Sequence, residues 1–158
     1  MSRYFRLGLI IAAVIMIADQ ATKWLIVARV MDPPRVIEVL PFFNIVMVWN
    51  RGVSFGAFND GSAAMGWVLT GFALAIAAGL VCWLWRAKDR LTAVAVGLII
   101  GGAIGNVIDR VRIGAVADFL DFHIGNYHWP AFNLADSAIT IGVGLILLEA
   151  LLGERRSA

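Results

Sequence analysis

Four long apolar stretches dominate this 158-residue sequence and constrain its fold more than any other feature. A helix that crosses a bilayer needs about 20 mostly apolar residues. The stretches at residues 7–28, 65–85, 91–108 and 135–152 reach or approach this length. Apolar residues make up 61% of the chain and charged residues only 15%, against about 25% charged residues in soluble proteins. We therefore predict an α-helical integral membrane protein with four transmembrane helices.

Two longer segments, residues 29–64 and 109–134, connect these stretches. Within the first, residues 36–58 are rich in Val, Ile and aromatic residues and contain an Asn-Arg-Gly turn signal. This pattern predicts two or three short β-strands. We expect a small extracytoplasmic β-sheet that lies against lipid headgroups or cradles an apolar ligand, with a plain connecting loop as the alternative.

Basic residues near the ends of the stretches predict the orientation of the chain, because cytoplasmic flanks carry an excess of Lys and Arg. The other side has fewer basic residues, spread over the two longer segments together with several acidic ones. Both termini are therefore expected in the cytoplasm, and residues 1–158 are expected to form one membrane-embedded domain. The basic residues on the predicted cytoplasmic side are Arg3, Arg6, Arg86, Lys88, Arg90, Arg155 and Arg156.

Polar residues occur near the outer ends of the predicted spans. An ionisable side chain at the centre of a membrane helix costs about 2.5–3.5 kcal/mol on insertion scales, so its position is informative. Because successive spans run in opposite directions, residues far apart in the sequence reach about the same depth. These residues are Asp19, Lys23, Asn50, Asn106, Asp109, Arg110, Asp118, Asn133 and Asp136.

Asp118 and Asp136 are the natural pair of carboxylates in this polar layer, since they come from segments that meet at the outer ends of the third and fourth spans. Two carboxylates in a dry site cannot both ionise easily, so the pair holds one proton. One aspartate can then accept a proton from water while the other polarises a carbonyl group. The spacing permits this chemistry, and alternatives stay open.

Local pairing is one alternative interpretation of the polar layer. It explains Asp118 less well, because no basic residue is adjacent to that carboxylate. The local pairs would be Asn133 or Asp136 as the N-cap of the fourth helix, Asp19 with Lys23, and Asp109 with Arg110 or Arg112.

Other classes of protein are less compatible with the sequence. A proton-carrying transporter predicts carboxylates spread through the membrane depth or an inverted repeat, and neither is evident. A non-catalytic scaffold predicts that aspartate-to-asparagine substitutions are tolerated.

Cys82 is the single cysteine, and His123 and His128 are not part of an HExxH motif, so no metal is expected. A net charge of +2 offers no footprint for nucleic acid.

Five short motifs follow one another from the first span to the fourth. They are DQATK at residues 19–23, NRGVSF at 50–55, GNVIDR at 105–110, VADF at 116–119 and FNLAD at 132–136. Together with the four spans, they resemble the lipoprotein signal peptidase family, also called signal peptidase II, whose members are bacterial membrane aspartic proteases.

The resemblance implies an enzyme of the bacterial inner membrane that cleaves prolipoproteins just before a diacylglyceryl-modified cysteine, near the extracytoplasmic face. The expected partners are this substrate and membrane lipid, without a cofactor, and one chain supplies every group, so a monomer is expected. Asp121 lies outside its motif and receives no catalytic role. The resemblance implies a catalytic dyad of Asp118 and Asp136, substrate-binding or site-orienting roles for Asn50, Asn106, Arg110 and Asn133, and structural support from Asp19, Lys23, Gly52 and Asp109.

Overall fold

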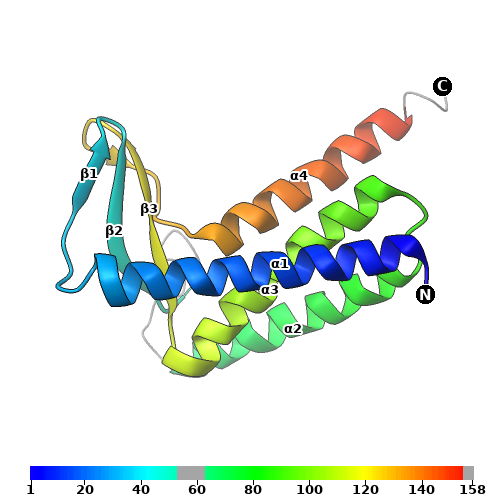
Figure 1. Ribbon diagram of the computed structural model, residues 1–158, viewed down its shortest axis with the longest axis horizontal. Helices are drawn as coiled ribbons and strands as arrows, with labels where there is room; N and C mark the ends of the chain where they lie inside the picture. The colour runs from blue at the N-terminus through cyan, green and yellow to red at the C-terminus, as the bar shows by residue number, and fades with distance from the viewer. Residues whose placement is uncertain (53–62, 155–158) are drawn as a thin grey trace.

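The computed structural model describes residues 1–52 and 63–154, which form four long helices and a small antiparallel sheet (Figure 1). A short π-helical segment, η1 (Ile26–Val30), continues the first helix. All four helices are long and apolar enough to cross a membrane, so the predicted fold class is confirmed. The helices are α1 (Arg3–Leu25), α2 (Ala63–Trp85), α3 (Arg90–Ile113) and α4 (Leu134–Glu154).

The sheet has the strand order β1-β2-β3-β4, and every neighbouring pair is antiparallel. Two of its strands lie in the aromatic segment where strands were expected, while residues 53–58 of that segment lie outside the described residues. The strand β3 comes from the segment after α3 and was not predicted. The strands are β1 (Ile37–Leu40), β2 (Phe43–Asn50), β3 (Val116–Ile124) and β4 (Tyr127–His128).

The helix α3 lies at the centre of the bundle and is buried over most of its length, whereas the other three spans are mostly exposed. Small residues allow this packing. A Cβ atom on Gly97 would lie 2.6 Å from the carbonyl oxygen of Gly8, and one on Gly101 would lie 2.6 Å from that of Ala12. The backbones of α1 and α3 therefore touch, as is typical of membrane helices with small residues at their interface.

The helix α3 is longer than the apolar stretch at residues 91–108. The helix α3 continues to Ile113, so that Asp109 and Arg110 lie within it and not in the following connection. Gly114, at φ 77°, ends the helix in the left-handed conformation, and its backbone N–H donates to the carbonyl oxygen of Arg110. The polar residues did not end the helix because their side chains face other protein elements and not lipid.

The two ends of the molecule differ in character (Figure 1). The start of α1, the end of α4 and the connection between α2 and α3 lie at one end of the bundle, and the sheet lies at the other. The end with the termini holds the expected basic residues at 3, 6, 86, 88 and 90, while Arg155 and Arg156 lie outside the described residues. The strand β3 brings its polar residues to the opposite end, next to the start of α4.

Candidate active site

Asp118 lies on β3 and its side chain is buried, with 2% of the residue exposed. Its Oδ1 accepts a hydrogen bond from Asn133 Nδ2 at 2.7 Å, and its Oδ2 accepts one from Asn50 Nδ2 at 3.0 Å. Burial, followed by the negative charge of Asp136, raises the pKa of Asp118 from 3.8 to about 6. Asp118 therefore retains a proton at pH values where an ordinary carboxyl group is ionised.

Asp136 lies in the first turn of α4, where it forms a reciprocal cap with Asn133. The Oδ1 atom of Asn133 accepts from the backbone N–H of Asp136 at 2.9 Å, and Asp136 Oδ2 accepts from the backbone N–H of Asn133 at 3.2 Å. The helix cap expected as an alternative to catalysis is therefore present. It does not exclude a site, because the same Asn133 side chain also donates to Asp118.

Three asparagines surround the two carboxylates, and each is held in one amide orientation. The Nδ2 atom of Asn106 donates to Asp136 at 2.8 Å, as those of Asn50 and Asn133 donate to Asp118. In each case the amide oxygen accepts a hydrogen bond from another group, and this bond directs the amide nitrogen toward a carboxylate. These donors are the backbone N–H of Gly52 for Asn50 (3.1 Å), Lys23 Nζ for Asn106 (2.9 Å) and the backbone N–H of Asp136 for Asn133 (2.9 Å).

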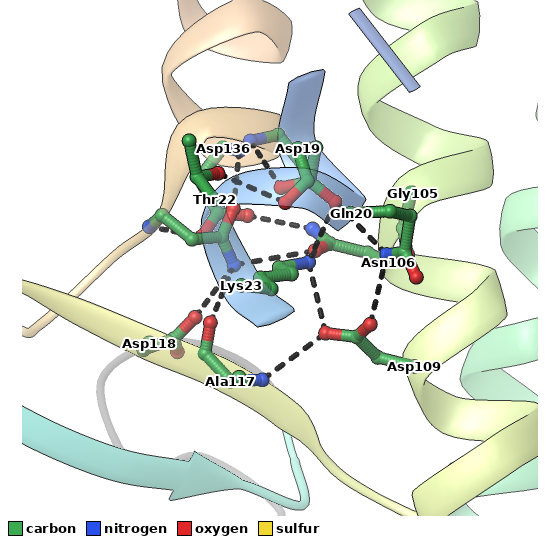
Figure 2. A network of polar contacts seen from close by, with 12 residues as sticks. Asp19, Gln20, Thr22, Lys23, Gly105, Asn106, Asp109, Ala117, Asp118 and Asp136 are labelled. Carbon is green, nitrogen blue, oxygen red and sulfur yellow. Dashed lines mark hydrogen bonds and ion pairs between the residues drawn. The ribbon is translucent and has the colours of Figure 1, made fainter. Parts of the chain in front are cut away.

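A buried charge network lies next to Asn106 (Figure 2). Lys23 Nζ is 2.9 Å from Asp19 Oδ2 and 2.9 Å from Asp109 Oδ2, in addition to its bond to Asn106. Gln20 Nε2 donates to Asp109 Oδ1 at 2.9 Å. The predicted pair of Asp19 and Lys23 is therefore present. In the alternative interpretation Asp109 pairs with Arg110 or Arg112, whereas in the structure its ion-pair partner among the described residues is the ammonium group of Lys23 on α1.

The same network ties four elements together. Asp109 Oδ2 accepts from the backbone N–H of Ala117 at 3.2 Å, beside Asp118 on β3. Asp19 Oδ1 accepts from the backbone N–H of Ala135 at 3.0 Å, beside Asp136 on α4. The two network carboxylates thus bond to the backbone immediately before each residue of the candidate dyad, which sets how β3 and α4 lie against α1 and α3.

A cavity of about 260 Å³ opens beside the polar centre between α2, α3 and α4. Asp136, Asn50, Asn106 and Arg110 contribute its polar wall. The Nε atom of Arg110 is buried and has no hydrogen-bond partner in the described part of the chain. The remaining wall is almost wholly apolar and consists of Leu69, Phe72, Ala73, Ile76, Ile99, Ala103, Val116 and Ile139.

A second cavity, of about 400 Å³, lies at the start of α4, and Asp136 lines it as well. Its other lining residues include Trp129, Phe132 and Ile141, with the hydroxyl groups of Ser137 and Thr140. Asp136 therefore stands between two cavities, both of which have mainly apolar walls.

Some polar contacts were not anticipated from the sequence. Gln20 belongs to the first motif but was given no role, although it bonds to both carboxylates beside Lys23. Asp121 is buried apart from the asparagines of the candidate site and bonds to Asn44 at 3.1 Å and His128 at 2.9 Å. Across residues 1–52 and 63–154, no group of three or more His, Cys, Asp or Glu side chains is arranged to hold a metal ion.

The fold and the polar centre define a class of protein, a four-helix membrane protein with two aspartates joined through one asparagine. The model of the family described as Signal peptidase (SPase) II matches residues 11–152 of the chain. The chain therefore belongs to the signal peptidase II family, and it is a peptidase.

Individual relatives agree with this assignment. The lipoprotein signal peptidase of Rhizorhabdus wittichii is 49% identical over 148 residues, which cover 92% of this chain and 86% of that protein. That of an Azoarcus species is 50% identical over 140 residues, covering 88% and 79%. A solved bacterial membrane enzyme structure, obtained by the in meso method at 2.3 Å resolution, has a TM-score of 0.80 at 37% identity and covers 94% of this chain and 88% of that chain.

Proposed function

We propose that this protein removes the signal peptide from diacylglyceryl-modified prolipoproteins by cleaving just before the lipidated cysteine, with Asp118 and Asp136 as its catalytic dyad. The observation that carries the proposal is the position of Asn133, which bonds to both carboxylates, one of which, Asp136, lines a mainly apolar cavity. The name shared by the relatives, lipoprotein signal peptidase, supports the class of substrate.

A difference in burial between the two aspartates supports different roles for them. Asp118 is the more deeply buried and, with its pKa raised to about 6, holds the proton of the pair. Asp136 is then the ionised carboxylate and the general base. It takes a proton from water while the water oxygen attacks the scissile carbonyl carbon, and Asp118 donates its proton to the carbonyl oxygen, which gives a neutral tetrahedral diol.

Collapse of the diol completes the reaction. Asp136 passes its new proton to the leaving nitrogen as the C–N bond breaks, and Asp118 recovers a proton from one diol hydroxyl group. The products are the carboxylic acid of the signal peptide and the free amine of the lipidated cysteine. Proton transfers of this kind contribute about 10²–10⁴-fold to the rate.

Arg110 and the asparagines complete the proposed site. The buried Nε–H of Arg110 has no partner among the described residues, and Arg110 lines the same cavity as Asp136, so we assign this donor to a carbonyl oxygen of the substrate backbone. Asn50, Asn106 and Asn133 donate to the dyad and hold its oxygens in place. The apolar wall formed by α2, α3 and α4 would take the signal helix.

The proposed orientation places both termini in the cytoplasm and the dyad near the extracytoplasmic face of the bacterial inner membrane. Residues 29–64 and 109–134 would then face outward. The basic residues at the end with the termini support this orientation, because cytoplasmic flanks are enriched in Lys and Arg. One chain supplies every group of the proposed mechanism, so a monomer is expected to be active.

Cleavage of a diacylglyceryl-modified prolipoprotein by the purified protein in detergent tests the proposal. We expect the wild type to cut before the modified cysteine, and Asp118→Asn and Asp136→Asn to lower the rate by at least about 10²-fold at equal folded amount. Asp121→Asn is the matched control, because it removes a buried carboxylate of the same strand that lies outside the proposed dyad. Normal cutting by either dyad variant would refute the dyad, and failure of the wild type would return the transporter or scaffold interpretation.

A further inference from the structure

We propose that Lys23 is a positioning residue for this reaction: through Asn106 it holds the negative charge of the dyad on Asp136. Lys23 would therefore do more than support the bundle. This inference rests on the proposed function and adds to it the reason why the two aspartates take different roles.

The ammonium group of Lys23 contacts three acceptors. An ammonium group has three N–H donors. Lys23 directs two of them at Asp19 and Asp109, each at 2.9 Å, and these two carboxylates already exceed its charge. The third donor goes to the neutral amide oxygen of Asn106, also at 2.9 Å. Charge balance does not require this third bond, so it calls for a separate explanation.

The bond selects one of the two orientations of the Asn106 amide. In the observed orientation the oxygen faces Lys23 Nζ and the nitrogen donates to Asp136 Oδ1 at 2.8 Å. If the amide were flipped, its NH₂ group would face the ammonium and its oxygen would face the carboxylate, and both contacts would be repulsive. Asn133 Nδ2 also donates to the Asn106 oxygen, at the longer distance of 3.3 Å, so Lys23 provides the shorter and charged of the two bonds that direct the Asn106 nitrogen toward Asp136.

The charge of Lys23 also distinguishes Asp136 from Asp118. A cation on the oxygen of an amide polarises the group and makes its N–H a stronger donor, and donation to the ionised form of a carboxyl group favours that form. Asp118 accepts from two asparagines, Asn50 and Asn133, and among the described residues the donors that the structure gives their amide oxygens are the neutral backbone N–H groups of Gly52 and Asp136. The two carboxylates therefore receive unequal donors, and the stronger one stabilises the negative charge on Asp136.

Charged groups besides Lys23 surround Asp136 and also influence the pH at which the dyad loses its proton. The helix α2 carries none among its described residues. The charge of Lys23 also lowers the pKa of Asp118, against the larger effects of burial and of Asp136. The groups that face the dyad from the other elements are Asp19 and Lys23 on α1, Asp109 and Arg110 on α3, and Asp118 on β3.

The test uses a variant that keeps the charge of the network. Lys23→Met alone would leave Asp19 and Asp109 facing each other without a cation, and such a protein can fail to fold. The double variant Lys23→Met/Asp19→Asn removes one positive and one negative charge and also the bond to Asn106. Gln20→Leu is the matched control, since it removes hydrogen bonds to Asp19 and Asp109 without touching Asn106.

Two measurements follow the proton of the dyad. The first is the pH profile of kcat/KM for cleavage of the lipidated prolipoprotein. The second is the infrared C=O band of the protonated dyad, assigned by its change in Asp118→Asn and Asp136→Asn, which requires no substrate. In the double variant we expect the pH profile of kcat/KM to move to higher pH by about one pH unit, and the pH at which the C=O band disappears to move by the same amount. A shift of about one unit is the size expected when a hydrogen bond to a charged group is lost. Gln20→Leu is expected to lower the midpoint of thermal unfolding but to leave the kcat/KM profile and the titration of the C=O band unchanged.

The possible outcomes separate the two proposals. The positioning role of Lys23 is overturned if the band of the double variant titrates as in the wild type, or if Gln20→Leu shifts it equally. If the wild type cuts no lipidated substrate while the band still shifts as expected, the proposed function fails and the placement of the charge by Lys23 stands.

Discussion

Asp118 destabilises the folded protein at neutral pH, and its replacement by asparagine is expected to stabilise the fold while removing activity. Its pKa is 3.8 in an ordinary environment and about 6 in the folded protein. Between these pH values the folded state binds more protons than the unfolded state, so stability is fully present below pH 3.8 and is lost as the pH rises through about 6. At pH values above both pKa values, the raised pKa of Asp118 lowers the free energy of unfolding by about 3 kcal/mol, because each unit of difference between the folded and the unfolded pKa is worth about 1.4 kcal/mol.

The asparagine variant avoids this cost but loses one contact. Its amide nitrogen would face the Nδ2 donor of Asn50 or of Asn133, where a carboxylate oxygen now accepts. One lost hydrogen bond costs about 1 kcal/mol. We therefore expect Asp118→Asn to be more stable than the wild type by about 2 kcal/mol at pH 8 and less stable by about 1 kcal/mol below pH 4.

Thermal unfolding in detergent micelles, followed by tryptophan fluorescence from pH 4 to pH 8, measures this difference. For a chain of this size, the expected gain at pH 8 corresponds to a rise of about 4–8 °C in Tm. The difference in Tm between the two proteins removes the effects of all other titrating groups that the substitution leaves unchanged. A difference that stays constant across this range, or a variant with a lower Tm than the wild type at pH 8, would refute the reasoning.

Two further predictions concern packing and the absence of a metal. Gly105→Ala would place a Cβ atom 2.5 Å from Asp19 Oδ2, so we expect it to destabilise the protein by about 1–3 kcal/mol and to lower cleavage. Gly144→Ala is its control, because a Cβ there meets no atom within 4 Å; equal Tm values for the two variants would contradict the packing argument. Chelators such as EDTA are expected to leave cleavage unchanged, as a dyad of aspartates needs no metal. Loss of activity that zinc restores would argue against the dyad.

Length and hydropathy were sufficient to predict the four spans, because the thickness of a bilayer sets the length of a helix that crosses it. The depth of the polar residues followed from the alternating direction of the spans. Asp118, Asp136 and the three asparagines could thus be placed in one layer before any coordinates were considered. The structure brings all five into one set of hydrogen bonds.

Other features depend on contacts that a single sequence does not reveal. The strand β3 escaped prediction because Asp118 and Asp121 interrupt its apolar pattern, and both are buried through pairing with other elements. The apolar stretch at residues 91–108 ends before α3 does, because Asp109 interrupts the apolar pattern although it is buried and paired with Lys23 of α1. The contact of Lys23 with Asn106 spans 83 positions of sequence, and the orientation of an amide group leaves no trace in composition or spacing.

The central place of α3 has a consequence for the order in which this protein assembles in the membrane. This helix carries the polar Asn106 and the ionisable Asp109 and Arg110, and such residues are costly in contact with lipid. Its carboxylate finds an ammonium partner on α1, which enters the membrane earlier, but the amide nitrogen of Asn106 finds its acceptor only on α4. The hydrogen bonds of the polar side chains on α3 are therefore incomplete until α4 has been inserted. Asp136 also lies on α4, so a nascent chain that lacks the fourth span would lack one carboxylate of the proposed dyad.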